Sequence, residues 1–320
     1  MMKSATGLIG AIARLALLPL CLTGCAQSRM TPPDLPLHTL RFDGMERSYY
    51  LHLPAGGKST ARPPLVLVLH GGGKGDGRAP ARYLGFTALA DRHGFIVVYP
   101  NGIDARWNDG RGFTHSGKSD TRVDDVGFIS KLIDHLVHTY AADASRVYVT
   151  GISNGGMMTL RLGCEISPKL AAIAPIAANI PKNILPGCHP AMPLPVLVMN
   201  GTGDPLVPWN GGPVHFFKRT MGEVVSTAQT VSFWVQHNRC RTTPAVSQLP
   251  DRDSADHSTV TVSTYNCPSK ESDVVLYAIN GGGHTLPGSN VPDRPRLLGY
   301  RNNDIDGAAV IWEFFRSYSR

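Results

Sequence analysis

Short, continuous runs of apolar residues recur along this chain at intervals that fit a helix. A continuous apolar run is typical of a strand that is buried on both faces, whereas a strand with one wet face alternates. Helical patterns lie between the runs, as in residues 126–137. The chain therefore predicts a single α/β domain whose mostly parallel central sheet has helices on both faces. The predicted strands are residues 49–53, 65–69, 95–99, 147–150, 196–199 and 274–279.

Helix starts are indicated by side chains that can accept hydrogen bonds from the free N–H groups of a first turn. These are Asp124 with Asp125 before residues 126–137, Ser226 with Gln229 before a helix through Val231, and Asp304 or Asp306 before the last helix. Residues 241–259 are rich in Thr, Ser, Asp and Pro, so we expect a surface excursion there, inside the domain.

The N-terminus has the pattern of a bacterial export signal. Residues 1–14 carry cations and no acid, residues 15–22 are apolar, and small residues lead to Cys25. This resembles a lipoprotein signal, which implies that residues 1–24 are a signal peptide and that Cys25 carries diacylglycerol. An ordinary secretory signal cleaved nearby is the alternative. Residues 25–40 are the expected lipidated tether, and residues 41–320 the expected hydrolase domain.

We therefore expect an exported protein. It is either secreted or anchored in the cell envelope through the N-terminal lipid only. If the cell is Gram-negative, Ala26 after the cysteine is compatible with transfer to the outer membrane. Beyond the N-terminus no stretch reaches the roughly 20 apolar residues that cross a bilayer. The net charge of +7 is carried by scattered Lys and Arg, which indicates a solvated surface and no nucleic-acid partner.

Four cysteines remain once Cys21 is removed with the signal and Cys25 is lipidated. An even number in an oxidising compartment predicts two disulfides, for which three connectivities are possible. The nearest-neighbour choice pairs Cys164 with Cys188 and Cys240 with Cys267. Metal binding is the weaker alternative, because no C-x-x-C or H-E-x-x-H spacing occurs.

A G-x-S-x-G pentapeptide centred on Ser153 lies between a predicted strand and a helical stretch. This context fits a nucleophile elbow, in which glycines let neighbouring backbones come close to a strained serine. A serine nucleophile needs a base, and the base needs an orienting acid. Asp204 and His284 each follow a predicted strand, so the order Ser, Asp, His is that of α/β-hydrolases. The alternative for Asp204 is an aspartate that only forms a turn, and the alternative for His284 is a loop histidine with no catalytic role.

An acyl-transfer site must also stabilise an oxyanion, usually with backbone N–H groups. The glycine-rich loop at residues 70–73 follows a predicted strand, where such a loop belongs. We expect the N–H groups of Gly72, Gly73 and Asn154 to form the oxyanion hole. The alternative is a phosphate-binding loop, but Lys74 lacks the earlier glycine and the following Ser or Thr that this loop needs.

Residues 40–320 resemble the polyhydroxybutyrate depolymerase-like esterases, with the feruloyl and acetylxylan esterases of carbohydrate esterase family 1. The matching motifs are residues 70–73, residues 99–102 with Trp107, residues 123–128, the Ser153 elbow, residues 201–204 with Val207 and Pro208, and residues 281–288. The resemblance implies the α/β-hydrolase fold, with Ser153 as nucleophile, His284 as base and Asp204 as its orienting acid. It also supports the nearest-neighbour pairing of the cysteines.

The chain departs from the family at Gly72, where many relatives have cysteine, and we expect this to change packing more than donor geometry. No Thr-rich linker and binding domain follows Arg320, which argues against action on insoluble polyester. Trp107 and Trp209 fall in loops that lie beside the site in this fold, where each could stack on an aromatic acyl group or a sugar. Simple packing is the alternative for both.

The sequence therefore predicts a serine carboxylic-ester hydrolase that acts through an acyl-enzyme and needs no metal or cofactor. The expected substrates are feruloyl or acetyl esters on polysaccharide, or hydroxyalkanoate oligoesters, with small xenobiotic esters also open. A serine peptidase of the same fold is the alternative in chemistry. A non-catalytic envelope binding protein is the alternative from another class, since fold alone does not give function.

Overall fold

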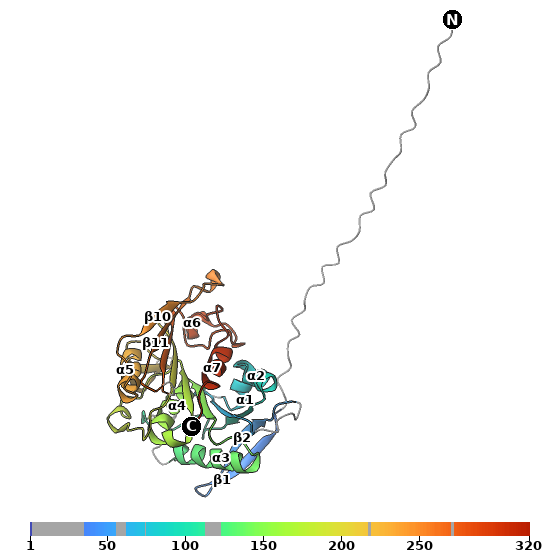
Figure 1. The fold of residues 1–320 in the computed structure, drawn as a ribbon, viewed down its shortest axis with the longest axis vertical. Coiled ribbons are helices and arrows are strands. Elements are labelled where there is room, and N and C mark those ends of the chain that lie inside the picture. Colours follow the sequence, from blue (N-terminus) through green and yellow to red (C-terminus); the bar gives the residue numbers. More distant parts are fainter. Residues whose placement is uncertain (2–34, 56–61, 74, 113–122, 217–218, 270–271) are drawn as a thin grey trace. The chain divides into compact units, whose positions relative to one another are not determined.

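The computed structural model of the protein describes residues 35–55, 62–73, 75–112, 123–216, 219–269 and 272–320, together with Met1. The predicted signal peptide at residues 1–24 and the lipidation site Cys25 lie outside the described residues. Residues 33–320 form one compact unit (Figure 1). None of the helices in the described ranges is long and apolar enough to cross a bilayer.

One large mixed sheet organises the fold. Across it the strands lie in the order β1, β2, β4, β3, β5, β6, β7, β12, β11, β10. The central strands from β4 to β12 are parallel, and antiparallel strands flank them at both edges. The bounds are β1 (Leu37–Phe42), β2 (Met45–His52), β3 (Leu65–Leu69), β4 (Ile96–Pro100), β5 (Val147–Ile152), β6 (Ala172–Ile176), β7 (Val196–Gly201), β10 (Ala245–Gln248), β11 (Thr259–Tyr265) and β12 (Val274–Asn280).

Alternate residues of the parallel strands enter two different apolar cores, which explains their continuous apolar character. In β3, Leu65, Leu67 and Leu69 belong to one core. Val66 and Val68 belong to the other core. The sheet therefore needs helices on both faces to keep both cores dry.

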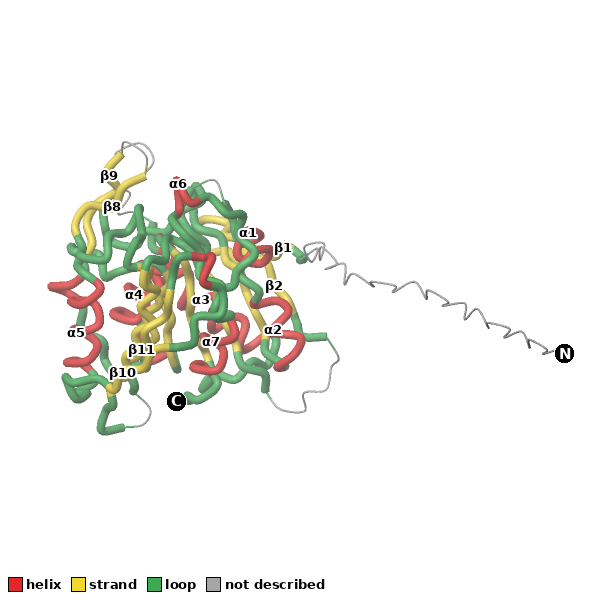
Figure 2. Tube along the Cα trace, turned by 90° about the horizontal axis from the view of Figure 1, so that it is seen from above, coloured by secondary structure: helices red, strands yellow, loops and turns green. Residues whose placement is uncertain are grey.

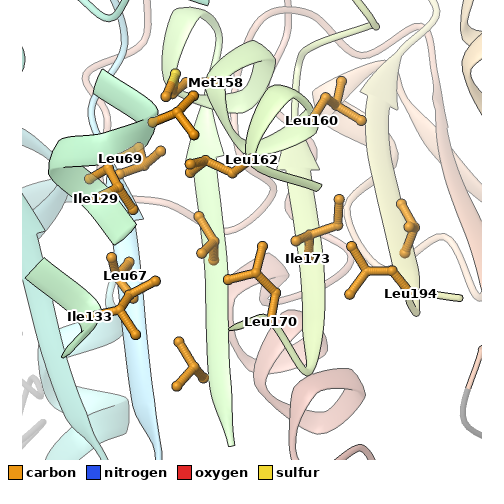
Figure 3. Packing of buried hydrophobic residues seen from close by; sticks show 14 of the residues in the cluster. Leu67, Leu69, Ile129, Ile133, Met158, Leu160, Leu162, Leu170, Ile173 and Leu194 are labelled. Atoms are coloured by element: carbon orange, nitrogen blue, oxygen red, sulfur yellow. The ribbon is translucent and has the colours of Figure 1, made fainter. Parts of the chain in front are cut away.

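Helices do cover both faces (Figure 1). On the Leu67 face lie α3 (Asp125–Thr139), α4 (Asn154–Glu165) and α5 (Thr227–His237), and on the other lie α1 (Arg78–Tyr83), α2 (Phe86–His93) and α7 (Gly307–Phe315). Figure 3 shows Ile129 and Ile133 of α3 beside Leu67 and Leu69 of β3. The short α6 (Pro295–Leu298) and three 3-10 helices (Ser167–Lys169, Leu185–Gly187, Ser254–Asp256) lie in loops. The predicted arrangement of sheet and helices is confirmed.

The helix starts follow the expected caps except at Asp125, whose buried carboxylate pairs with Arg47 and accepts the N–H of Asn108. The carboxylate of Asp124 accepts a hydrogen bond from the N–H of residue 127 in α3, and Ser226 with Gln229 forms the complete capping box of α5. Of the two candidates for the last helix, Asp306 is the N-cap of α7. Asp304 instead is buried and accepts the N–H groups of residues 252 and 253.

Some strands have no clear signal in the sequence. β6 reads Ala-Ile-Ala-Pro-Ile, and alanine and proline are poor strand formers. β1 begins at Leu37, inside the segment predicted as a tether. Its residues pair with β2 from Leu37 onward, and their exposure alternates along the strand. The excursion expected at residues 241–259 contains β10, an exposed strand at the edge of the sheet.

The carboxyl ends of the parallel strands meet at one end of the sheet. β4 and β5 lie on opposite sides of β3, so the chain reverses direction across the sheet there, and ligands bind outside such a reversal point in open α/β sheets. The hairpin of β8 (Gly212–Phe216) and β9 (Arg219–Val224) follows β7. Figure 2 shows this hairpin and α6 at the same end of the sheet.

Candidate active site

Ser153 lies in the turn between β5 and α4 with φ 60° and ψ −121°. A positive φ is rare for a residue with a side chain and costs free energy, so the surrounding contacts must hold it. The Ser153 N–H donates to the carbonyl oxygen of Ile176, and its carbonyl accepts from Met157, at 2.9 Å each. These bonds fix the serine in the strained conformation of a nucleophile elbow.

The two glycines of the pentapeptide are required by close backbone approach. A Cβ on Gly151 would lie 2.6 Å from the carbonyl oxygen of Gly155. A Cβ on Gly155 would lie 2.5 Å from the carbonyl oxygen of His70 and closer still to that of Leu69. The elbow is therefore packed directly against the end of β3, where no side chain would fit.

His284 and Asp204 are paired although they lie in different loops. Nδ1 of His284 lies 2.7 Å from Oδ2 of Asp204, and the two side chains are 7% and 2% exposed. The other carboxylate oxygen, Oδ1, accepts the N–H groups of Leu206 and Val207 at 2.8 and 2.9 Å. An ionised carboxylate held this way accepts a hydrogen bond from the Nδ1–H of the ring, which leaves Nε2 as the nitrogen with a free lone pair.

The acid loop and the histidine loop are themselves in contact. Gly203 donates its N–H to the carbonyl oxygen of Gly282 at 2.9 Å, and a Cβ on Gly201 would collide with the same oxygen. Gly283 in turn donates to the carbonyl oxygen of Tyr300 at 2.7 Å. These backbone contacts explain the run of glycines before His284 and fix its position relative to Asp204.

Ser153, Asp204 and His284 thus follow β5, β7 and β12, which are parallel strands of the same sheet. Neither the Ser153 hydroxyl nor Nε2 of His284 hydrogen-bonds to any group in the described ranges, so both are available to a substrate. Active-site hydrogen bonds are often long before substrate binds and tighten in the complex.

The loop after β3 lies against the elbow. A Cβ on Gly71 would be 3.5 Å from Cβ of Ser153, and one on Gly72 would be 3.4 Å from Cβ of Asn154. The backbone N–H groups of Gly72 and Asn154 have no acceptor among the described residues. Two free backbone donors therefore lie on two segments that meet at the elbow, the loop after β3 and the start of α4.

His70, in the same loop, is buried and cannot act as the base. Its Nε2 accepts the N–H of Gly102 at 3.0 Å, so Nδ1 carries the proton and donates to the carbonyl oxygen of Gly71 at 2.8 Å. Burial lowers the pKa of His70, because the charged imidazolium would lose its hydration. His70 is therefore a neutral structural residue that shapes the loop.

Trp107 is buried in the wall behind the elbow. It is 3% exposed, its Nε1 donates to the carbonyl oxygen of His70 at 3.0 Å, and its ring packs on the His70 ring with centroids 5.0 Å apart. The structure thus favours the packing alternative for Trp107 over stacking on substrate. Trp209, in the loop before the β8–β9 hairpin, is half-buried.

A buried polar cluster, which the sequence does not reveal, surrounds Trp107. The Asn154 side chain bonds to Trp107 and to Asp109, and Asp109 forms an ion pair with Arg111 at 2.7 Å. The side chains of the pair are about 5% and 6% exposed. Asp109 and Arg111 are two residues apart in a polar loop, a spacing typical of an Asx turn, and this is the only local signal that could point to them.

Two disulfides are present among the described residues. Cys164, near the end of α4, pairs with Cys188, and Cys240, after α5, pairs with Cys267, which is the nearest-neighbour pairing. Within the described ranges, no group of three or more His, Cys, Asp or Glu side chains is placed to hold a metal ion.

The chain is similar in sequence to known esterases. The family model described as esterase PHB depolymerase matches residues 47–180. The "Putative esterase NocK" of Nocardia uniformis subsp. tsuyamanensis is 32% identical over 285 residues, which cover 85% of this chain and 79% of NocK. Feruloyl esterase B of Piromyces equi is 30% identical over 204 residues, or 62% of this chain and 35% of that protein. This chain therefore spans about a third of the length of that fungal relative.

The fold is shared with solved esterases. An acetyl xylan esterase from Aspergillus awamori superposes with a TM-score of 0.57 at 15% identity, over 88% of this chain and 99% of that one. A thermostable esterase superposes with a TM-score of 0.56 at 16% identity, over 90% of this chain and 64% of that one. At such identities the likeness shows the fold alone, and it confirms the predicted α/β-hydrolase architecture.

Proposed function

Because the chain belongs to the esterase PHB depolymerase family, we propose that it hydrolyses carboxylic esters through a covalent acyl-enzyme on Ser153. The observation that carries this proposal is the buried Asp204–His284 pair, 2.7 Å long, in the same set of strand-end loops as a strained serine. A paired carboxylate is the group that holds an imidazole in the tautomer that a serine nucleophile needs.

In the proposed acylation step, Oγ of Ser153 attacks the ester carbonyl carbon while its proton passes to Nε2 of His284. The negative charge that develops on the carbonyl oxygen is stabilised by the N–H groups of Gly72, Gly73 and Asn154. The bond to the alcohol then breaks, and the alcohol leaves with the proton from Nε2. Asp204 keeps its charge throughout and stabilises the imidazolium.

Deacylation repeats these steps with water as the nucleophile. Nε2 of His284 takes a proton from water as the water oxygen bonds to the acyl carbon. The second tetrahedral intermediate expels Oγ of Ser153, which recovers the proton from Nε2, and the carboxylic acid leaves. The proposed cycle balances with one ester and one water consumed, and it involves no metal or cofactor.

We propose acyl esters on polysaccharide, feruloyl or acetyl, or oligomeric hydroxyalkanoate esters as substrates. The relatives, which include feruloyl esterase B and acetylxylan esterase A, support this substrate class. The half-buried Trp209 ring is the proposed stacking surface for an aromatic acyl group or a sugar. Trp107 is excluded from this role because its ring is buried.

We also propose that the mature protein is exported, with a lipid on Cys25. The two disulfides support an oxidising compartment. Palmitate labelling of the protein in its host, lost in Cys25→Ala, tests the lipid. Labelling that persists in Cys25→Ala would refute it.

The proposed activity is tested with p-nitrophenyl acetate, p-nitrophenyl butyrate, methyl ferulate and a 3-hydroxybutyrate oligomer, using protein that lacks residues 1–25. Turnover that disappears in Ser153→Ala and persists in Ser232→Ala, an exposed serine of α5, supports the proposal. Absence of turnover on every ester, with folded protein, would contradict it. Cleavage of peptides instead of esters would indicate a serine peptidase. Turnover of neither esters nor peptides would indicate the non-catalytic binding protein.

A further inference from the structure

Trp107 joins the two sides of the proposed oxyanion hole. Its indole Nε1–H donates to the carbonyl oxygen of His70, the residue that begins the glycine loop after β3. Its backbone bonds to Asn154, the first residue of α4, in both directions. The Trp107 N–H donates to Oδ1 of Asn154 at 2.8 Å, and Nδ2 of Asn154 donates to the Trp107 carbonyl at 3.0 Å.

The loop that carries Trp107 is also held by hydrogen bonds of two residues that follow it, Asp109 and Arg111. Oδ2 of Asp109 accepts from Nδ2 of Asn154 at 2.6 Å and from Nε of Arg111 at 2.9 Å. Arg111 donates a further hydrogen bond to the Met221 carbonyl in β9 at 3.0 Å. Because the Asp109 and Arg111 side chains are almost fully buried, these charge-assisted bonds act where water cannot compete.

The separation of the two free donors therefore depends on a third element. The N–H groups of Gly72 and Asn154 belong to different loops, and no hydrogen bond joins those two residues directly within the described ranges. Trp107 is bonded to the carbonyl oxygen of His70, two residues before the first donor, and to the side chain of the residue that carries the second donor. A shift of this residue would change the distance between the donors by moving the His70 side. The Asn154 N–H belongs to the same peptide as the Ser153 carbonyl, which Met157 holds in place.

We propose that Trp107 is a positioning residue of the oxyanion hole, setting the separation of the Gly72 and Asn154 N–H groups. This inference rests on the proposed esterase function. Oxyanion donors act on charge that exists only in the transition state, so a change in their separation lowers kcat and leaves KM unchanged. A residue that only packed the loop would lower stability without this selective effect.

The test is Trp107→Phe, which removes the indole N–H and keeps an aromatic ring against His70. The matched control is Trp312→Phe, because Trp312 is 4% exposed and its Nε1 has no hydrogen-bond partner in the described part of the chain. Misplacing a catalytic contact slightly can lower the rate by up to about 100-fold, so we expect a loss of about tenfold or more in kcat. KM should stay within about twofold, and Trp312→Phe should keep the original kcat.

A second measurement reads the same donors without turnover. An alkylboronic acid forms a tetrahedral adduct with a serine hydroxyl and places an oxygen where the oxyanion would lie. Its inhibition constant should rise in Trp107→Phe by the same factor by which kcat/KM falls, and it should not change in Trp312→Phe.

Asn154→Ala is the second variant, in case Trp107→Phe does not fold. It keeps the backbone N–H of Asn154 but removes the anchor to Trp107, so kcat should again fall at constant KM. The inference is overturned if kcat is unchanged in folded Trp107→Phe or Asn154→Ala. It is also overturned if KM rises in these variants while kcat stays the same. The esterase proposal fails separately, if Ser153→Ala retains turnover or the unmodified protein has none.

Discussion

Nδ1 of His284 lies 2.7 Å from Oδ2 of Asp204, although 80 residues separate them in the chain. The two loops that carry these residues follow β12 and β7, which are parallel neighbours in the sheet. The pairing is therefore a consequence of strand order, because parallel neighbours end at the same edge of a sheet. It is also the feature that makes a serine esterase the best account of the site.

Asp204→Asn should lower kcat by about 10³- to 10⁴-fold, because an amide cannot stabilise the imidazolium and can hold the ring in the wrong tautomer. Steady-state hydrolysis of p-nitrophenyl butyrate measures this change. Asp306→Asn is the matched control, since asparagine caps a helix as well as aspartate does, and it should leave kcat unchanged. A loss of less than tenfold in Asp204→Asn would contradict the assigned role.

The stability of the protein should fall in mild acid, in part through His70. Burial lowers the pKa of His70 in the folded state, so the unfolded chain binds the proton first as the pH falls. The contribution of His70 to the free energy of unfolding is complete above its ordinary pKa of about 6.5. It is lost progressively below that pH, at up to about 1.4 kcal/mol per pH unit.

Urea unfolding between about pH 8 and pH 5 tests this dependence by comparing the protein with His70→Asn. The variant retains a donor for Gly71 but has no group that titrates there, so its free energy of unfolding should fall less steeply with acid. Equal slopes for the two proteins would show that His70 does not contribute.

Asp125→Asn should destabilise the fold by about 3–5 kcal/mol, because it leaves the buried Arg47 charge without a partner. The two side chains are 1% and 0% exposed and lie 2.6 Å apart. Burial raises the pKa of Asp125, and the Arg47 guanidinium opposes that rise. Urea unfolding at neutral pH measures the loss. Breaking the exposed Lys182–Glu223 pair with Glu223→Gln should cost no more than about 1 kcal/mol.

Gly155→Ala should destabilise the protein by about 1–3 kcal/mol or prevent folding, since its Cβ would meet the backbone of Leu69 and His70. Alanine is the better helix former at this position in α4, so any loss is steric. Gly187→Ala is the control, because nothing lies within 4 Å of a Cβ there. Equal midpoints of urea unfolding for the two variants would refute the close approach of elbow and β3.

Strands with a strong local signal are predictable from the sequence. Residues 65–69 have five apolar side chains in a row and form β3 with those bounds. β6 escapes prediction because its alanines and proline become a strand only through pairing with β5 and β7. The loops around Ser153 and before His284 are predictable from their glycines. A close backbone approach excludes any residue with a side chain at those positions.

The polar cluster behind the elbow could not be predicted. Asn154 meets Asp109 across 45 residues, and Arg111 meets Met221 across 110. Nothing in the local pattern encodes such pairs, because they depend on how far apart loops settle once the sheet forms. Trp107 illustrates the limit, since its position beside the site suggests a substrate contact and its burial shows a structural one.

The most direct test of the central claim is the mass of the protein quenched in acid during turnover of p-nitrophenyl butyrate, followed by peptide mapping. An acyl-enzyme on Ser153 predicts one butyryl group per chain, carried by the peptide that contains this serine. It also predicts that no adduct forms in Ser153→Ala. A butyryl group on another residue, or turnover that persists in Ser153→Ala, would contradict it.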